Sequence, residues 1–429
     1  MTGAPYSVIH PWTRHADVAM ETELAREVIG ARGCWVETRD GQRLLDGSAG
    51  LWNVNVGYGR AEVIDAIGEA LGTLSFRSLI ARPSAKLNAL ANRLLGRMPS
   101  NMSRVMFHCT GTAAVEAALL LVRQHFKLMG EFERSGIIAL EGGFHGSSLL
   151  ATAVTGLPGD AQWFEPLPPH IYHIAAPLTP EQQAKSLDQL EQLIRDKGAR
   201  HFQSMILEPV MGVEGAFVLP EAWIEKVAAI CQASGIKLIS DEVACGLGRV
   251  GRWVAWPSRI KIDVVVIGKG LSGGYIPAAA SVFDAGIASV LCRAEDMDVK
   301  YGSTMDGCPA ACAAASAVLD IIEREDLIGR ARDVGEYLLS RLGGLLDLPI
   351  VERIQGDGLM MGIKLCARSS PGTSMTAECM NEIVEALRQG GLLLDPEGNS
   401  ALLIYPPLIL SHDEADFLAV GLTRVLERF

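Results

Sequence analysis

Two residues could together carry out chemistry on an aldehyde-bearing cofactor. Lys269 directly follows a short apolar segment, residues 264–267, and glycines stand on both sides of it. Asp241 follows a second apolar segment, residues 236–240. A lysine amine bonds covalently to an aldehyde, and a buried carboxylate keeps a ring nitrogen protonated so that the ring accepts electrons. A lysine and an acid at the carboxyl ends of two buried strands therefore predict a site for pyridoxal phosphate.

Each of the two residues also has a plainer interpretation. Lysines that follow strands are common and usually solvated, and Asp241 could be a helix cap or a surface acid. Gly268 and Gly270, however, let the backbone approach a bulky group. Burial also lowers the pKa of a lysine amine, which makes it nucleophilic. An ionised carboxylate after an apolar strand needs a cationic partner, and a pyridinium N–H is a fitting one.

Three further segments, each bounded by glycine, could complete such a site. Gly111 and Thr112 precede an expected helix, whose N-terminus would bind the cofactor phosphate, although a simple N-cap explains them as well. Phe144 could stack on a flat ring beside His145, or both could be structural residues of a tight turn. Thr304 lies in a cluster of hydroxyl residues and is either a second phosphate contact or a cap.

The elements that position these residues alternate along the chain. From about residue 60 to 325, strand-like and helix-like segments follow each other, which predicts an α/β fold with a mostly parallel sheet covered on both faces. Ligands of such folds bind at the carboxyl ends of the strands, where Thr110, Glu208, Asp241 and Lys269 fall. Strands are expected at residues 105–108, 202–207, 236–240 and 264–267, and helices at 114–127, 221–234 and 308–324.

The chain is expected to divide into three parts. Residues 1–55 form an N-terminal segment with a helix near 17–30 and a hairpin that turns at Asp40-Gly41. Residues 56–325 form the large cofactor-binding domain. Residues 326–429 form a smaller α+β domain, with strands near 351, 359, 392 and 402 and a final helix.

The bulk composition narrows the class of protein. Of the 429 residues, 49% are hydrophobic and 21% are charged, which predicts a sizeable core. The net charge of −12 argues against a nucleic-acid or anionic membrane surface, since both need clustered cations. Nine scattered cysteines without a Cys-x-x-Cys pair favour free thiols in a reducing compartment over a zinc site. Without a leader-like start or a long apolar run, we expect a soluble cytoplasmic protein that binds no metal.

The ordered segments resemble the class III aminotransferases of pyridoxal-phosphate fold type I. The Glu-Pro-Val-Met-Gly-Val-Glu-Gly stretch at Glu208 resembles the family's Glu-Pro-x-x-Gly-x-Gly-Gly. Residues 241–251 and 268–277 closely match two further family motifs. The segment 46–60, Asp-Gly-Ser-Ala-Gly-Leu-Trp-Asn-Val-Asn-Val-Gly-Tyr-Gly-Arg, resembles the omega-type enzymes that use amines and pyruvate. The similarity runs in order from about residue 33 to 420, which is nearly the whole chain.

This resemblance implies a role for each matching residue around the cofactor ring. Lys269 would be the Schiff-base lysine and proton shuttle, and Asp241 the partner of the ring nitrogen. Val243 would pack on one face of the ring and Phe144 on the other.

The resemblance also implies contacts to the phosphate and the substrate. Gly111 and Thr112 would hold the phosphate, and Thr304 would reach it from the neighbouring subunit of an obligate homodimer. Glu208 is similar to the family's active-site glutamate. Trp52 would line the substrate pocket as in omega-type enzymes, or simply pack in the core.

The chain departs from the family pattern at several positions. Ala113 stands where the family has an acid, Phe144 replaces the usual tyrosine, and Glu214 replaces a glycine. Many relatives have an arginine where Asp395 stands, and that arginine grips the substrate carboxylate as a bidentate fork. An aspartate would repel a carboxylate, unless the loop points the acid into solvent. Arg77, together with Arg82, could supply a substitute clamp near the expected subunit interface.

We therefore expect a pyridoxal-phosphate-dependent aminotransferase that acts on small-molecule amines and carbonyl compounds. Lys269 would move a proton between substrate and cofactor carbons, and Asp241 would stabilise the electron-rich state. Asp395 favours a biosynthetic substrate without an α-carboxylate at the reacting carbon, such as a large or peptide-borne ketone. Two alternatives stay open: an aminomutase or decarboxylase on the same fold, and a cofactor-binding protein that has lost its activity.

Overall fold

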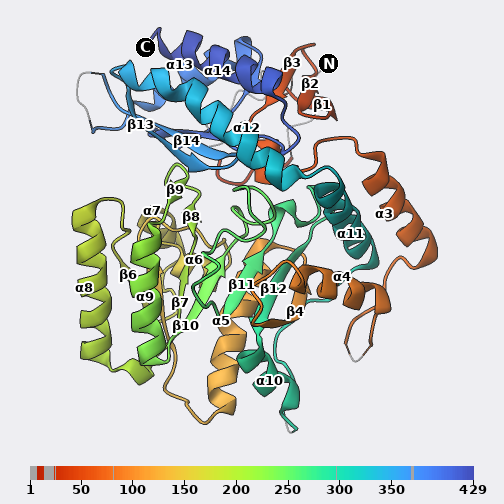
Figure 1. Ribbon diagram of the computed structural model, residues 1–429, viewed down its shortest axis with the longest axis vertical. Coiled ribbons are helices and arrows are strands. Elements are labelled where there is room, and N and C mark those ends of the chain that lie inside the picture. The colour runs from red at the N-terminus through yellow and green to blue at the C-terminus, as the bar shows by residue number, and fades with distance from the viewer. Residues whose placement is uncertain (1–6, 14–23, 25, 81, 296, 369–371) are drawn as a thin grey trace.

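A seven-stranded sheet forms the centre of the molecule (Figure 1). The computed structural model describes residues 7–13, 24, 26–80, 82–295, 297–368 and 372–429. Among the described strands of this sheet, only β12 runs in the direction opposite to the rest. The predicted mostly parallel sheet is thus confirmed. Its order is β4 (Met102–His108), β12 (Ala279–Asp284), β11 (Val264–Ile267), β10 (Lys237–Asp241), β7 (Phe202–Leu207), β5 (Gly136–Leu140) and β6 (Ile171–Ile174).

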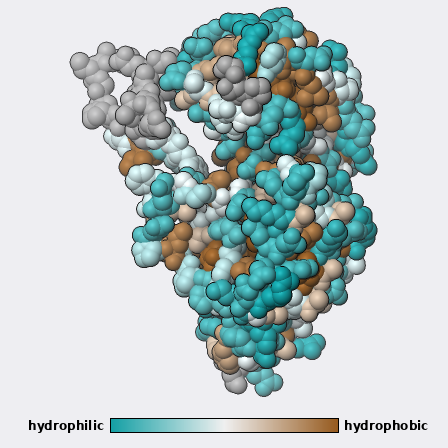
Figure 2. All heavy atoms as spheres, turned by 90° about the vertical axis from the view of Figure 1, so that its left-hand side faces the viewer, coloured by the Kyte–Doolittle hydropathy of each residue, from teal (hydrophilic) through white to brown (hydrophobic). Residues whose placement is uncertain are grey.

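Helices cover both faces of this sheet because alternate residues of its buried strands point in opposite directions. Val264 and Val266 of β11 pack into one hydrophobic cluster, and Val265 and Ile267 into another. The first cluster includes α5 (Gly111–Leu128) and α10 (Ala285–Arg293). The second includes α4 (Ala85–Leu95), α8 (Pro180–Lys197), α9 (Glu221–Ser234) and α11 (Pro309–Arg324). Figure 2 shows the side of the molecule that carries α8, and this face is mostly hydrophilic.

A second, antiparallel sheet lies in the C-terminal part, drawn in blue above the first in Figure 1. Its order is β13 (Val351–Asp357), β14 (Met360–Leu365), β17 (Ala401–Ile404) and β16 (Asp395–Glu397). The helices of this part are α12 (Leu327–Leu342), α13 (Ala377–Gln389) and α14 (His412–Leu426), and they bury their apolar faces in one shared cluster.

The N-terminal strands join this C-terminal part. The predicted hairpin is confirmed as β2 (Trp35–Thr38) and β3 (Arg43–Asp46), and β3 pairs in parallel with β15 (Leu392–Leu393). After it come α2 (Ala49–Trp52) and α3 (Ala61–Thr73). The division of the chain near residues 55 and 325 stays a proposal, which the shared cluster of N- and C-terminal residues supports.

Two local expectations differ from the structure. Residues 28–30, expected to end a helix, belong instead to β1 (Val28–Arg32), because this segment pairs with β2. Residues 14–23 and 25 of the expected helix lie outside the described part. No strand was expected at residues 395–397, which include Pro396. β16 forms there because it pairs with β17. The remaining short elements are α6 (Leu149–Val154), α7 (Pro158–Ala161), η2 (Gln162–Phe164), η3 (Ala199–His201), β8 (Val210–Met211), β9 (Phe217–Val218), η4 (Lys269–Leu271) and η5 (Gly343–Asp347).

Candidate active site

A cavity of about 1020 Å³ opens at the carboxyl ends of the parallel strands. It is lined by Thr110 after β4, Glu208 after β7, Asp241 at the end of β10 and Lys269 after β11. This is the location that ligands occupy in open α/β sheets. The predicted site residues that line it are Trp52, Gly111, Thr112, Phe144, His145, Glu208, Asp241, Val243 and Lys269.

Lys269 lies in an unusual local environment. It begins η4 with a φ of 32°, which is uncommon for a residue with a side chain. Its amine lies 4.1 Å from the centroid of the Trp52 ring. Burial lowers the pKa of Lys269 to about 8, although the carboxylates of Glu208 and Asp241 act in the opposite direction. An amine with this pKa is available as a nucleophile and as a base near neutral pH.

Asp241 is buried and held by two hydrogen-bond donors. Its Oδ2 lies 2.8 Å from Nδ1 of His145, and its Oδ1 accepts a hydrogen bond from the Val243 N–H at 3.1 Å. Burial by itself would lower the pKa of His145, but the hydrogen bond and the charge of Asp241, with the charge of Glu208, raise it. His145 thereby fixes the orientation of the Asp241 carboxylate, which could accept a hydrogen bond from a protonated ring nitrogen.

Glu208 is a second buried acid beside Lys269. Its carboxylate accepts hydrogen bonds from the backbone N–H groups of Phe144 at 3.1 Å and Gly212 at 3.3 Å. Burial raises the pKa of Glu208 to about 7, and the Asp241 carboxylate adds to this effect. Glu208 can therefore gain or lose a proton near neutral pH.

The first turn of α5 faces the same cavity. The hydroxyl of Thr110 caps this helix by accepting a hydrogen bond from the Ala113 N–H at 3.1 Å. Gly111 has to be small, because a side chain there would begin 2.9 Å from a methyl group of Val243. The N-terminus of an 18-residue helix carries partial positive charge, which suits a phosphate group.

These residues fit pyridoxal phosphate. The cavity presents an amine, a buried carboxylate, a helix N-terminus, and the side chains of Val243 and Phe144 for the two faces of a ring. Two buried nitrogens of lining residues, His145 Nε2 and Trp52 Nε1, have no hydrogen-bond partner among the described residues. Buried polar atoms are seldom left without a partner, so these two are suited to a bound group.

Three predicted site residues do not line this cavity. Thr304 is exposed in the turn before α11, and Arg77 is exposed in the segment after α3. Asp395 begins β16, where its N–H donates a hydrogen bond to the Ser48 hydroxyl at 3.1 Å. Asp395 is not among the described residues that line the cavity, so its role in the substrate site stays a prediction.

The acid of this segment that does line the cavity is Glu397, two residues further along β16. Burial raises the pKa of Glu397 to about 7, and repulsion from Glu214 and Asp160 adds to this effect. Asp160, in α7, also lines the cavity. The sequence contained a signal for Glu397, since the same segment holds Asp395 and Glu397. Which of these two acids lies at the cavity depends on how β16 pairs with β17, and this pairing could not be read from the sequence.

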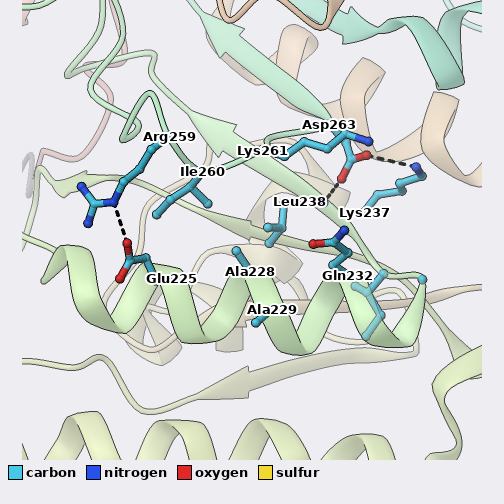
Figure 3. A pocket seen from close by; sticks show the side chains of 12 residues that line it. Glu225, Ala228, Ala229, Gln232, Lys237, Leu238, Arg259, Ile260, Lys261 and Asp263 are labelled. Atoms are coloured by element: carbon cyan, nitrogen blue, oxygen red, sulfur yellow. Dashed lines mark hydrogen bonds and ion pairs between the residues drawn. The ribbon is translucent and has the colours of Figure 1, made fainter.

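A second cavity, of about 340 Å³, lies at the opposite ends of β10 and β11, beside α9 (Figure 3). Its charged side chains are paired: Lys237 lies 3.0 Å from Asp263, Arg259 lies 2.6 Å from Glu225, and Lys261 lies 3.8 Å from Asp284 outside the cavity lining. It contains neither strained backbone nor an unpaired buried polar atom among its described residues. We therefore assign the chemistry to the larger cavity.

Two classes of feature were not found in the part of the chain that the structure describes. No helix there is long and apolar enough to cross a membrane. No group of three or more His, Cys, Asp or Glu side chains there could hold a metal ion.

Comparison with known proteins places the chain in a family. The model of the family "Aminotransferase class-III" matches residues 18–426. An uncharacterized aminotransferase, y4uB of Sinorhizobium fredii, is 33% identical over 96% of this chain and 92% of its own length. An omega-aminotransferase of Caulobacter vibrioides is 29% identical, and the match covers 94% of this chain and 93% of the relative.

The solved structures agree with these relatives. An amine transaminase from an uncultivated Pseudomonas species, in its PLP-bound form, superimposes with a TM-score of 0.93 at 32% identity and covers 99% of both chains. The expected fold, cofactor and reaction class are thus confirmed. The chain belongs to the class III aminotransferases, enzymes that use pyridoxal phosphate to transfer amino groups.

Proposed function

We propose that this aminotransferase takes primary amine donors without a carboxylate at the reacting carbon. One observation carries the proposal: no arginine is among the described residues that line the cavity, whereas Asp160, Glu208, Asp241 and Glu397 are. A carboxylate is held most strongly by a guanidinium fork and is repelled by carboxylates. Two similar proteins are an omega-aminotransferase and an amine transaminase, which agrees with an amine as substrate.

The residues of the cavity have the properties that the reaction requires. When bound, pyridoxal phosphate supplies an aldehyde for covalent attachment and a ring that accepts electrons. Lys269 Nζ could take a proton from the reacting carbon of the substrate and deliver it to a carbon of the cofactor, because the pKa of this amine lies near neutral pH. Asp241, fixed by His145, would hold the proton of the ring nitrogen. Val243, Phe144 and Trp52 exclude water around Lys269.

We further propose that the donor carries a second cationic group at its far end. Glu397 and Asp160 line the cavity, and Glu214 is close enough to Glu397 to raise its pKa. Glu397, partly buried and repelled by the other two acids, would be stabilised by a bound cation. The volume of about 1020 Å³ also leaves room for a large ketone as the amino acceptor.

We also propose a homodimer with shared active sites in a reducing compartment. Thr304 and Arg77 lie outside the cavity of their own chain and are exposed, so both are available to a neighbouring subunit. All nine cysteines are free, which supports a reducing environment. Exposed apolar side chains on α3 and the segment after it offer a surface for the second copy: Ile64, Leu71, Leu74 and Ile80.

A half-reaction screen tests the proposed substrates. The purified holoenzyme is mixed with single donors, and cofactor absorbance reports conversion to the pyridoxamine form. We expect diamines to react faster than monoamines of equal length, and monoamines faster than α-amino acids. Faster reaction of α-amino acids would contradict the proposal. Carbon dioxide, or a product with a shifted amino group, would indicate a decarboxylase or an aminomutase instead.

A further inference from the structure

A left-handed turn presents Trp52 to the cavity. The four residues of α2 all have positive φ: 46° at Ala49, 58° at Gly50, 78° at Leu51 and 68° at Trp52. Only glycine adopts such values readily, so three of these four residues are in a disfavoured conformation. Consecutive residues of this kind persist only where their surroundings hold them, and they gather at functional sites.

Asp46 holds this turn through both oxygens of its carboxylate. Oδ1 accepts a hydrogen bond from the Ser48 N–H at 2.8 Å, and Oδ2 accepts one from the Gly50 N–H at 2.9 Å. Oδ2 also accepts the Tyr58 hydroxyl at 2.7 Å. Asp46 is fully buried, and its charge is stabilised by these three donors. A side chain at Gly50 would begin 2.8 Å from the Tyr58 oxygen, so this network requires a glycine there.

The turn determines where the Trp52 ring lies. The ring is 8% exposed and packs edge-on against Tyr405, with 4.7 Å between the ring centroids. On another side it lies against Gly212, where an added side chain would begin 3.2 Å from it. It thereby comes within 4.1 Å of the Lys269 amine. A right-handed backbone would send this side chain elsewhere, because the direction of a side chain follows its φ and ψ.

We propose that Asp46 is a positioning residue for substrate specificity: it clamps the left-handed turn Ala49–Trp52 and so holds the Trp52 ring beside the reacting amine. This role rests on the proposed function, in which the amine donor binds in the cavity that Trp52 lines. Tyr58 acts with Asp46, since its hydroxyl completes the network and its ring lines the cavity. The volume left for the donor therefore depends on the conformation of the Ala49–Trp52 backbone as well as on the size of the Trp52 side chain.

A double-mutant cycle tests the clamp. KM and kcat are measured for Asp46→Ala, Trp52→Ala and the double variant, with a small and a bulky donor chosen from whichever compounds the wild type turns over. We expect Asp46→Ala to raise KM for the small donor about ten-fold and to reduce the discrimination against the bulky donor. We expect the same two effects from Trp52→Ala. Because both act through one ring, the double variant should be no worse than Trp52→Ala.

Two further variants separate positioning from folding. In the Asp46→Ala background, Ala49→Gly removes left-handed strain and should restore part of the lost discrimination. Asp284→Ala is the matched control, since Asp284 is another buried acid that accepts a backbone hydrogen bond, from Ile287 at 2.8 Å, away from the cavity. It should lower the melting temperature and leave the KM ratio unchanged.

The outcomes are distinct. Additive effects of Asp46→Ala and Trp52→Ala, or an unchanged KM ratio in a less stable Asp46→Ala protein, would overturn the clamp. A preference for α-amino acids would instead contradict the proposed donor class and leave the cycle valid, because the cycle uses the best available donor.

Discussion

Buried carboxylates, rather than cations, dominate the surroundings of Lys269. Glu208 and Glu397 both have pKa values raised to about 7, chiefly by burial, while burial lowers the pKa of Lys269 to about 8. These values lie close together, so the protonation of the site changes over a narrow pH range around neutrality. A donor amine that enters as a cation is attracted by this charge distribution, whereas a carboxylate is not.

Glu397 provides a prediction at the scale of a single residue. Its carboxyl group is charged above about pH 7 and neutral below it, so it attracts a distal cation only at the higher pH. We expect the ratio of KM for a monoamine to KM for the diamine of equal length to rise about ten-fold from about pH 6 to about pH 8. In Glu397→Gln this ratio should be independent of pH. Asp395→Asn is the control, and loss of the pH dependence there instead would place the cation beside Asp395.

Elements differ in how far their own residues determine them. The bounds of α9 were predictable because Pro220 precedes the helix and Gly235 ends it in a left-handed conformation. β11 was predictable because a continuous apolar run is typical of a strand buried on both faces. β1 and β16 were not predictable, since each is held by the strand beside it. The antiparallel direction of β12 likewise depends on chain connection rather than on residue type.

The N-terminus of α5 provides a prediction at the scale of an element. Thr110→Ala removes the cap hydrogen bond to Ala113 and should lower the free energy of unfolding by about 1 kcal/mol. It should also weaken pyridoxal phosphate binding, because the capped turn faces the cavity. Thr376→Ala removes the equivalent cap of α13, from Cys379, far from that turn. Urea unfolding and cofactor dissociation separate the effects: equal cofactor loss in both variants would show that general stability, not the turn, retains the cofactor.

At the scale of the whole molecule, the site joins segments that are far apart in the sequence. Most residues proposed for the cofactor could be brought together from the sequence, because they follow strands of one sheet and such strand ends meet at one edge. Trp52 was predicted only through the family resemblance, and Glu397 was not predicted, because both lie in segments that reach the cavity through packing of the N- and C-terminal parts. The role predicted for Asp395 stays a prediction, and Glu397 lines the cavity instead. Whether Thr304 and Arg77 reach a cavity depends likewise on packing, in their case on the packing of two subunits.

Intersubunit complementation provides the prediction for the whole molecule. Thr304→Asp places a negative charge where we propose that the neighbouring subunit's phosphate binds, and Lys269→Ala removes the reacting amine, so each homodimer should be nearly inactive. Subunits that exchange form hybrids in which one site has the native Lys269 and receives the native Thr304 from its partner. Random exchange should restore about a quarter of the wild-type sites, because half of the dimers are hybrids with one intact site. Activity that stays absent, although native gels show hybrids, would mean that Thr304 does not serve the neighbouring subunit.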